Sequence, residues 1–182
     1  LRTTRKEVEA SRQRYADLYD SAPVGYFTFD RNGVVLEVNL TGASMLGVER
    51  TKLLKTPLTL LVSKEDRDTF NTHCQKVFRT SKRQSCELEF TRKDGKTFFA
   101  ELGSVRTDGE TFRTAMNDIT KRKKAEGTLK ESEEKYQGIF DRANDGIIAY
   151  DLNSRKFLYV NKSMSELTGH SREEILKLGV KD

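Results

Sequence analysis

The sequence predicts an α+β fold, in which five antiparallel strands form one sheet and helices cover one face of that sheet. Three observations lead to this prediction. Alternating apolar and polar residues mark five strands, short turns join neighbouring strands, and helical segments separate the second strand from the third. Short turns make neighbouring strands antiparallel, and the apolar face of a sheet must be buried by another layer.

The first strand is predicted over residues 24–30 and the second over residues 34–38, with an Arg-Asn-Gly turn between them. Asn and Gly tolerate the positive φ angles that a tight turn requires. Pro23 precedes the first strand, and proline cannot continue a helix interior. We therefore expect an N-terminal helix over residues 1–20 to end before it.

Helical segments follow the second strand. Asn39 is expected to cap a short helix that ends at Gly47, and residues 50–54 form a further helical turn. Ser63 is expected to cap a longer helix, because two acidic residues follow it where the helix dipole favours negative charge. One face of that helix is apolar and is formed by Phe70, Cys74, Val77 and Phe78.

The last three strands are predicted over residues 85–91, 97–106 and 111–119. An Asp-Gly pair stands in each of the two intervening turns, which is a strong hairpin signal. In residues 85–91 the apolar side chains alternate with glutamates, so one face of this strand is buried. The last strand runs directly into a helical linker.

The chain contains an internal repeat. Residues 11–30 align with residues 132–151 at a constant offset of 121 (136 − 15), which pairs Tyr15 with Tyr136. After a one-residue insertion, Asn39 aligns with Asn161. A repeat of this length has the size of a domain rather than of a solenoid unit. The second copy stops early, so we expect residues 141–182 to be poorly ordered or to pack on another chain.

Both helices that precede a repeat carry a thin apolar stripe at heptad spacing. The seam residues are Val8, Tyr15 and Leu18 in the first helix and Leu129, Tyr136 and Ile139 in the linker. Each stripe fits either a weak coiled coil or a helix docked on its own domain. We favour a parallel dimer in which the chain is its own partner.

The order of these elements resembles the PAS family. The matching features are a strand that ends in Asp30, the capped helix from Asn39, the long helix after Glu65, a Lys-Asp-Gly turn before Lys96, and the closing Asp-Ile-Thr with the basic run at 121–124. The resemblance covers residues 12–126 and, as an incomplete copy, residues 133–182. In the family the closing stretch is a PAC-type ending, whose Asp and Thr tie the last strand to the outgoing helix.

The resemblance implies roles for Asp118 and Thr120 in signal coupling. It also implies four segments: an N-terminal coiled-coil helix (1–20), a PAS domain with its PAC-type ending (21–120), a helical linker (121–140) and the truncated start of a second PAS domain (141–182). Tandem PAS domains with such linkers are typical of bacterial sensor histidine kinases and diguanylate cyclases.

The implied function is signal sensing and relay within a larger cytoplasmic two-component protein, with an output domain as partner. PAS domains bind a small molecule between sheet and helices, or bind nothing and act as dimerising relays. A pocket would be lined by residues that face the predicted interior: Phe70, Cys74, Cys86, Leu88, Leu102, Ser104 and Met116. The alternative is that these side chains fill the core.

No cofactor can be assigned from the sequence. Light-sensing PAS domains carry an N-C-R-F-L-Q-like stretch, and neither Cys74 nor Cys86 lies in one. Haem-binding PAS domains use a histidine of the long helix, and the aligned position here is Phe70. His73 lies one turn later, and we expect it to be exposed or half-buried. We therefore expect neither flavin nor haem, no metal site and no catalytic residue.

Composition limits the classes of partner. The 182 residues carry a net charge of +5, but basic and acidic residues are interleaved, so we expect no nucleic-acid site. The two cysteines form no CxxC pair, which suits a reducing compartment. Apolar runs are too short to span a bilayer, so no membrane contact is expected here, although the parent protein can be membrane-anchored.

Overall fold

The computed structural model describes residues 2–80, 82–107 and 109–178. Residue 1 of the expected N-terminal helix and residues 179–182 of the second copy lie outside this description. The chain divides into two compact units, Leu1–Lys123 and Lys124–Asp182, which we describe separately. Helix α5 (Thr120–Arg142) begins in the first unit and ends in the second.

The sheet of the first unit has five antiparallel strands in the order β2-β1-β5-β4-β3. These strands are β1 (Gly25–Asp30), β2 (Val35–Val38), β3 (Gln84–Thr91), β4 (Thr97–Arg106) and β5 (Thr111–Asp118). The predicted α+β class with a five-stranded antiparallel sheet is therefore confirmed. The first and last strands pair at the centre, where Gly25 lies opposite Met116.

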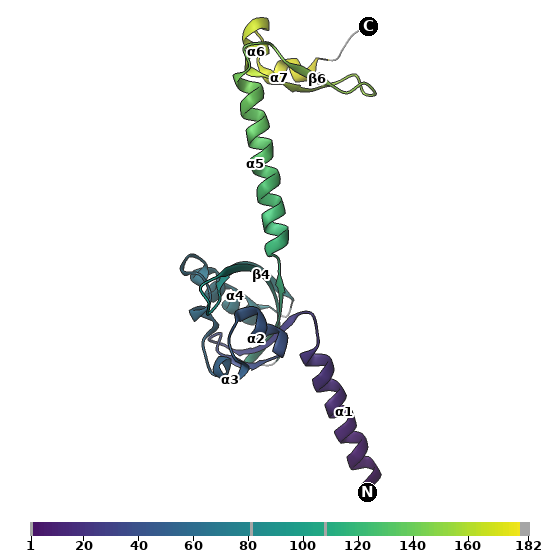
Figure 1. Ribbon diagram of the computed structural model, residues 1–182, viewed down its shortest axis with the longest axis vertical. Coiled ribbons are helices and arrows are strands. Elements are labelled where there is room, and N and C mark those ends of the chain that lie inside the picture. The colour runs from purple at the N-terminus through teal and green to yellow at the C-terminus, as the bar shows by residue number, and fades with distance from the viewer. Residues whose placement is uncertain (1, 81, 108, 179–182) are drawn as a thin grey trace. The chain divides into compact units, whose positions relative to one another are not determined.

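The segment between β2 and β3 is helical. It consists of α2 (Leu40–Leu46), α3 (Arg50–Leu53), the 3-10 turns η1 (Leu58–Leu60) and η2 (Lys64–Asp66), and α4 (Arg67–Arg79). Helices α2 and α4 pack on one face of the sheet (Figure 1). As predicted, Asn39 caps α2 with its side chain, and Gly47 ends the helix in the left-handed conformation.

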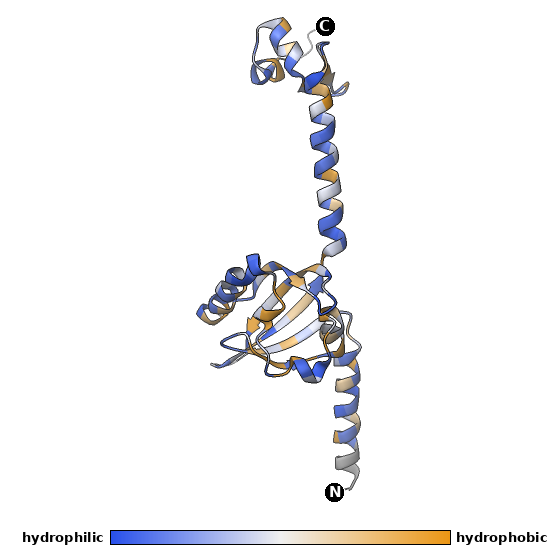
Figure 2. Cartoon of the chain, turned by 60° about the vertical axis from the view of Figure 1, so that its left-hand side comes forward, coloured by the Kyte–Doolittle hydropathy of each residue, from blue (hydrophilic) through white to orange (hydrophobic). Residues whose placement is uncertain are grey.

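The core lies between these helices and the inward side chains of the strands. Phe29 on β1 contacts Phe112 on β5, with ring centres 5.2 Å apart, and meets the ring of Phe70 on α4 edge to face. All three rings are fully buried. Hydrophobic residues gather along the strands of this unit, whereas α5 is largely hydrophilic along its length (Figure 2). Burial of these aromatic side chains is the main source of stability for the unit.

The prediction that Ser63 caps the long helix is wrong. The backbone at Ser63 is extended, because its N–H donates to Glu89 O on the edge of β3. A 3-10 turn follows, and α4 begins only at Arg67. Among the described residues, the Ser63 hydroxyl has no hydrogen-bond partner. The carboxylate of Asp66 accepts a hydrogen bond from the N–H of Glu89, so this acidic residue bonds to the edge strand β3.

Helix α1 (Arg2–Asp20) contacts the other face of the sheet through its C-terminal turn. The ring of Tyr19 stacks on that of Tyr26, with centres 5.9 Å apart. Tyr26 alternates along β1 with the buried Phe27 and Phe29, so its side chain points away from the core. The sheet of the first unit therefore has helical contacts on both faces.

The second unit repeats the beginning of the first. After α5 come β6 (Ile148–Tyr150), β7 (Phe157–Val160), α6 (Lys162–Thr168) and α7 (Arg172–Lys177). Two strands and two short helices in this order match β1, β2, α2 and α3, as the sequence repeat predicted. The poor order expected for residues 141–182 stays a prediction. Packing of this segment on another chain stays a prediction.

Among the described residues, every helix is too short or too polar to cross a membrane.

Candidate sensing and signal-coupling sites

The residues of the predicted pocket lie together in the core of the first unit. Five of them are at most 1% exposed: Phe70, Leu88, Leu102, Ser104 and Met116. The sulfur-bearing members of the set, Cys74 and Cys86, are buried and half-buried respectively. These side chains are enclosed by protein atoms and pack against one another. Binding of a ligand by this set stays a prediction.

A chain of polar groups crosses this core. The Nε2 atom of His73 on α4 lies 2.8 Å from the hydroxyl oxygen of Ser104 on β4. That hydroxyl lies 2.7 Å from the hydroxyl of Thr114 on β5. His73 is only 3% exposed, so the expectation that it is exposed or half-buried is wrong. It turns inward, where the hydroxyl of Ser104 satisfies one ring nitrogen and is itself paired with the hydroxyl of Thr114.

Burial also sets the protonation of this cluster. Loss of solvent, together with the nearby positive charge of Lys76, lowers the pKa of His73 to about 4. The imidazole is therefore neutral at pH 7. A neutral imidazole has one donor and one acceptor nitrogen, so it can hold a hydroxyl group in a fixed orientation. The cluster thus connects α4 to β4 and, through Thr114, to β5.

The two thiols behave as small apolar groups. Burial raises the pKa of Cys74 to about 12, and burial likewise raises the pKa of Cys86 to about 12. A thiol at such a pKa is almost wholly protonated at neutral pH and is a poor nucleophile. Both residues are free cysteines. Within the described residues, no group of three or more His, Cys, Asp or Glu side chains is placed to hold a metal ion.

The last strand is joined to α5 by a compact junction. The carboxylate of Asp118 accepts a hydrogen bond of 2.8 Å from the N–H of Thr120. The hydroxyl of Thr120 accepts one of 3.0 Å from the N–H of Phe99 on β4, and the N–H of Ile119 donates to Phe99 O. The first turn of α5 is therefore bonded to the central part of the sheet. The structure brings Asp118 and Thr120 together, as the resemblance implied.

Glu87 forms a second connection at this junction, which sequence reasoning missed. Its carboxylate on β3 contacts both Arg122 and Lys123 in the first turn of α5. Hydrogen bonds from Lys123 and then Arg122 lower the pKa of Glu87. The glutamate is at an outward position of β3, and the basic run was visible in the sequence. What was missing was the strand register that brings them together.

The seam residues of both helices are exposed within their own units. The exposed fractions are 51% for Val8, 69% for Tyr15 and 71% for Leu18 in α1. In α5 they are 61% for Leu129, 62% for Tyr136 and 58% for Ile139. Exposed apolar residues at heptad spacing fit a dimer seam, which stays a prediction.

The C-terminal end of α1 also borders a groove on the outer face of the sheet. The groove has a volume of about 620 Å³, and Tyr15 and Leu18 line it together with Tyr26, Leu36 and Leu54. Burial raises the pKa of Tyr19, which lies between the tyrosine rings, to about 12. Docking of α1 on its own domain, the second alternative, is therefore seen at its last turn, where Tyr19 stacks on Tyr26.

Comparison with known proteins places this geometry in a family. A family model described as a PAS domain matches residues 23–121, and a second PAS domain model matches residues 134–181. The first match covers more than half of the chain. The two matched regions correspond to the two copies of the internal repeat.

Two curated relatives are similar over most of this chain. The chain is 26% identical to sporulation kinase E of Bacillus subtilis over 164 residues, which cover 89% of the chain and 22% of the kinase. It is 24% identical to the methyl sulfide methyltransferase-associated sensor of Methanosarcina acetivorans over 163 residues, which cover 81% of the chain and 15% of the sensor. The chain thus spans less than a quarter of the length of either relative.

Solved PAS structures share the fold. A PAS domain of an HTR-like protein from Haloarcula marismortui superposes with a TM-score of 0.59 at 23% identity, covering 65% of this chain and all of that one. A domain of a sensory box sensor histidine kinase/response regulator from Geobacter sulfurreducens gives a TM-score of 0.53 at 19% identity, covering 61% of this chain and 96% of that one. At these identities the likeness concerns the fold alone.

Proposed function

The chain belongs to the PAS-domain family, and on this basis we propose that it is the signal-sensing and signal-relay module of a larger protein, a sensor histidine kinase. The parent carries the output domain, to which this module passes a change induced by a ligand or a partner. The similarity to sporulation kinase E supports a kinase as the parent. The fold shared with a PAS domain from a two-component sensor histidine kinase fits the same proposal (TM-score 0.51, 18% identity).

The junction between β5 and α5 is the observation that carries this proposal. A strand at the centre of the sheet continues into a helix after a single residue, and side chains of that turn bond to the neighbouring strand. A change in the twist of β4 or β5 therefore moves the first turn of α5. Because an α-helix is stiff along its axis, such a movement reaches the far end of α5.

We propose that α5 acts in a parallel dimer. Its seam residues Leu129, Tyr136 and Ile139 would then pack against their own counterparts in a second copy. Thin seams of this kind are weak, so two packings can differ by little free energy, and a small rotation at the junction can select one of them. Two-state repacking at a helical interface is a known form of signal relay. The paired copies of α1 would form a second seam of the same type.

The proposed location of the module is the cytoplasm, whether or not the parent protein is anchored in a membrane. Two free cysteines within a folded unit support a reducing compartment.

A second candidate is a ligand-free dimerisation and protein-interaction module of a diguanylate cyclase or a transcriptional regulator. The polar chain through the core favours it, because His73, Ser104 and Thr114 satisfy one another without any ligand. A binding pocket ordinarily presents polar groups that a ligand completes. A visible absorption spectrum and native mass spectrometry of residues 1–182 separate the two. Added mass or an absorption band supports a ligand sensor, and their absence supports the relay.

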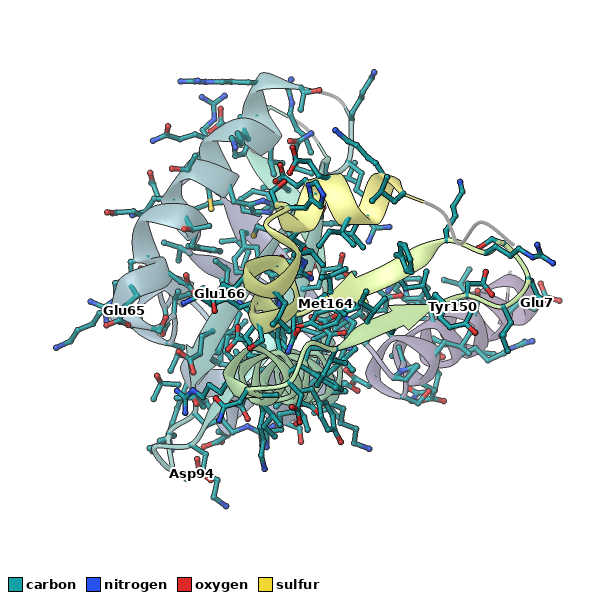
Figure 3. All side chains as sticks on the ribbon, turned by 90° about the horizontal axis from the view of Figure 1, so that it is seen from above. Glu7, Glu65, Asp94, Tyr150, Met164 and Glu166 are labelled. Atoms are coloured by element: carbon teal, nitrogen blue, oxygen red, sulfur yellow. The ribbon has the colours of Figure 1, made fainter. Side chains whose placement is uncertain are left out.

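The coupling role is tested in the full-length parent protein with Asp118→Ala. The variant should unfold at nearly the wild-type temperature and should lose the response of kinase autophosphorylation to the signal. Asp94→Ala is the matched control, because Asp94 accepts a backbone hydrogen bond from the residue two positions later, as Asp118 does, but in the hairpin loop between β3 and β4 (Figure 3). Autophosphorylation that responds equally in both variants would exclude Asp118 from the relay.

A further inference from the structure

A buried asparagine joins the incoming helix of the first unit to the sheet. Asn39 is fully buried, and its side-chain oxygen accepts hydrogen bonds from the N–H groups of Tyr26 and Gly42, at 2.8 Å and 2.9 Å. Its side-chain nitrogen donates to the carbonyl oxygens of Tyr19 and Val24, at 2.8 Å and 2.9 Å. Tyr19 lies in the last turn of α1. One amide therefore contacts the end of a helix, the start of β1 and the start of α2.

The second unit reproduces these four hydrogen bonds at the equivalent positions. The side-chain oxygen of Asn161 accepts from the N–H groups of Ile147 and Met164, at 2.8 Å and 3.0 Å. Its side-chain nitrogen donates to the carbonyl oxygens of Phe140 and Asp145, each at 2.9 Å. Phe140 lies in the last turn of α5. All four partners differ in residue type from those in the first unit, so the backbone geometry is what the amide recognises.

Capping of the following short helix explains only half of this network. An N-cap side chain needs one acceptor oxygen, and Asp, Ser or Thr supplies it as well as Asn. The two donor bonds of Asn161 are additional. One of them satisfies a carbonyl in the last helical turn of α5, where carbonyl groups lack a partner within the helix. A side chain that caps one element and holds the end of another needs both donors and acceptors on a short stem, which is the property of asparagine.

A neighbouring side chain reinforces this hold in each unit. The hydroxyl of Thr41 donates to Ala22 O in the first unit, and the hydroxyl of Ser163 donates to Ala143 O in the second. The equivalent acidic residues in the last turns of α1 and α5 are used differently. Asp20 accepts from the N–H of Leu40 on α2, whereas Asp141 accepts from the hydroxyl of Tyr159 on β7.

We propose that Asn161 is the positioning residue that transmits movement of α5 to the second PAS unit. This inference rests on the proposed relay function and names the residue at its receiving end. The first turn of α5 is bonded to the first sheet through Thr120, and Asn161 connects its last turn to α6 and to Ile147, the residue directly before β6. A rotation of the helix then displaces the start of β6 and the capped start of α6 together.

The test is a double-mutant cycle on the 182-residue chain, with amide hydrogen exchange as the measurement. Asp118→Ala perturbs the first turn of α5, and Asn161→Asp removes the donor half of the amide while keeping both acceptor bonds. Asn161→Asp alone should speed exchange in the last turn of α5, at Asp141 and Arg142, by about tenfold, the effect of one lost hydrogen bond. Met164, whose N–H is still capped, should stay protected.

The decisive quantity is the change that Asp118→Ala causes in the amide exchange rates of Ile147 and Met164. We expect a change in their exchange rates when Asn161 is present and none in the Asn161→Asp background. Asn39→Asp is the matched control, because it removes the same donors in the first unit and should leave this response intact. A response that persists in the Asn161→Asp chain would overturn the inference while the relay function stands. No response in either background would overturn the relay through α5, and the inference with it.

A second variant separates positioning from folding. Asn161→Ser retains a capping oxygen for Met164 but has no amide to reach Phe140. If Asn161→Asp loses the protection of the β6–β7 hairpin, Asn161→Ser takes its place in the cycle, with the same expected loss of response. If both variants lose that protection, Asn161 is required for folding alone, and the inference is wrong.

Discussion

The Nε2 atom of His73 lies 2.8 Å from the hydroxyl oxygen of Ser104, in the buried interior between α4 and β4. Thr114 extends this contact to β5 through a second short hydrogen bond with Ser104. Three polar groups on three elements thus meet where apolar packing would otherwise be expected. Since each partner is paired inside the core, removal of one leaves another buried and unsatisfied.

Ser104→Ala should therefore destabilise the first unit. The substitution removes the hydroxyl between His73 and Thr114 and leaves both without that partner, so we expect the free energy of unfolding to fall by about 1–3 kcal/mol. Urea denaturation followed by circular dichroism measures the change. Ser85→Ala, at an exposed position of β3, is the control and should shift stability by less than about 0.5 kcal/mol. Equal effects of the two substitutions would mean that the polar chain contributes nothing.

The buried His73 should make stability depend on pH. Its pKa is lowered from 6.5 to about 4 in the folded chain, mainly by burial. As the pH falls below 6.5, the unfolded chain binds a proton at His73 and the folded chain does not, so stability decreases until the pH reaches about 4. Between pH 7 and pH 5 this residue should lower the free energy of unfolding by about 2 kcal/mol.

Comparison with His73→Gln isolates that contribution, because glutamine keeps a hydrogen-bonding side chain but does not titrate in this range. Urea unfolding of both chains at pH 7 and pH 5 gives the four values needed. The wild type should lose more stability than the variant over this interval. The same loss in both chains would show that other groups account for the pH dependence.

The thiols of Cys74 and Cys86 should be unreactive in the folded chain. Burial raises the pKa of each to about 12, so the thiolate is scarce at pH 8. We expect alkylation by iodoacetamide to be slower than in urea by roughly two to three orders of magnitude. Ser85→Cys adds an exposed thiol to β3 and should react rapidly in the same sample. Rapid modification of the two native thiols would mean that the core opens readily around them.

The linker seam should be detectable by cross-linking. In a parallel dimer, residue 129 of one copy faces residue 129 of the other, so Leu129→Cys should form an intermolecular disulfide under mild oxidation. Glu131→Cys, two residues away and off the seam, should not. Non-reducing electrophoresis reports the outcome. Equal cross-linking at both positions would indicate random collision, and no cross-linking at either would contradict a parallel seam in α5.

Local signals in the sequence located most of the elements. The Asn-Gly and Asp-Gly turns placed the hairpins, and the cap at Asn39 and the stop at Gly47 bounded α2 correctly. These features depend on residues close together in the chain. The pairing of β1 with β5 joins residues far apart in sequence, and no turn signal encodes it.

The errors and omissions share a physical cause. Serine is a residue type that often caps helices, but the backbone N–H of Ser63 bonds to Glu89 O on β3 instead. Glu89 lies 26 residues away in the sequence (89 − 63). His73 was ambiguous on the helix because its partners, Ser104 and Thr114, come from later strands. Glu87 was read only as an outward residue, since its contact with the first turn of α5 depends on sheet register. Sequence periodicity indicates which way a side chain points, but not which residue it meets.

The neighbouring position of β1 and β5 has a consequence for how such units can be joined in tandem. Gly25 lies opposite Met116, so the backbone arrives and departs at adjacent strand ends of one sheet. A gene segment that encodes one helix followed by one sheet can therefore be copied in tandem, with the departing helix of one copy serving as the arriving helix of the next. The 121-residue offset between Tyr15 and Tyr136 (136 − 15) is the length of one such helix-and-sheet unit.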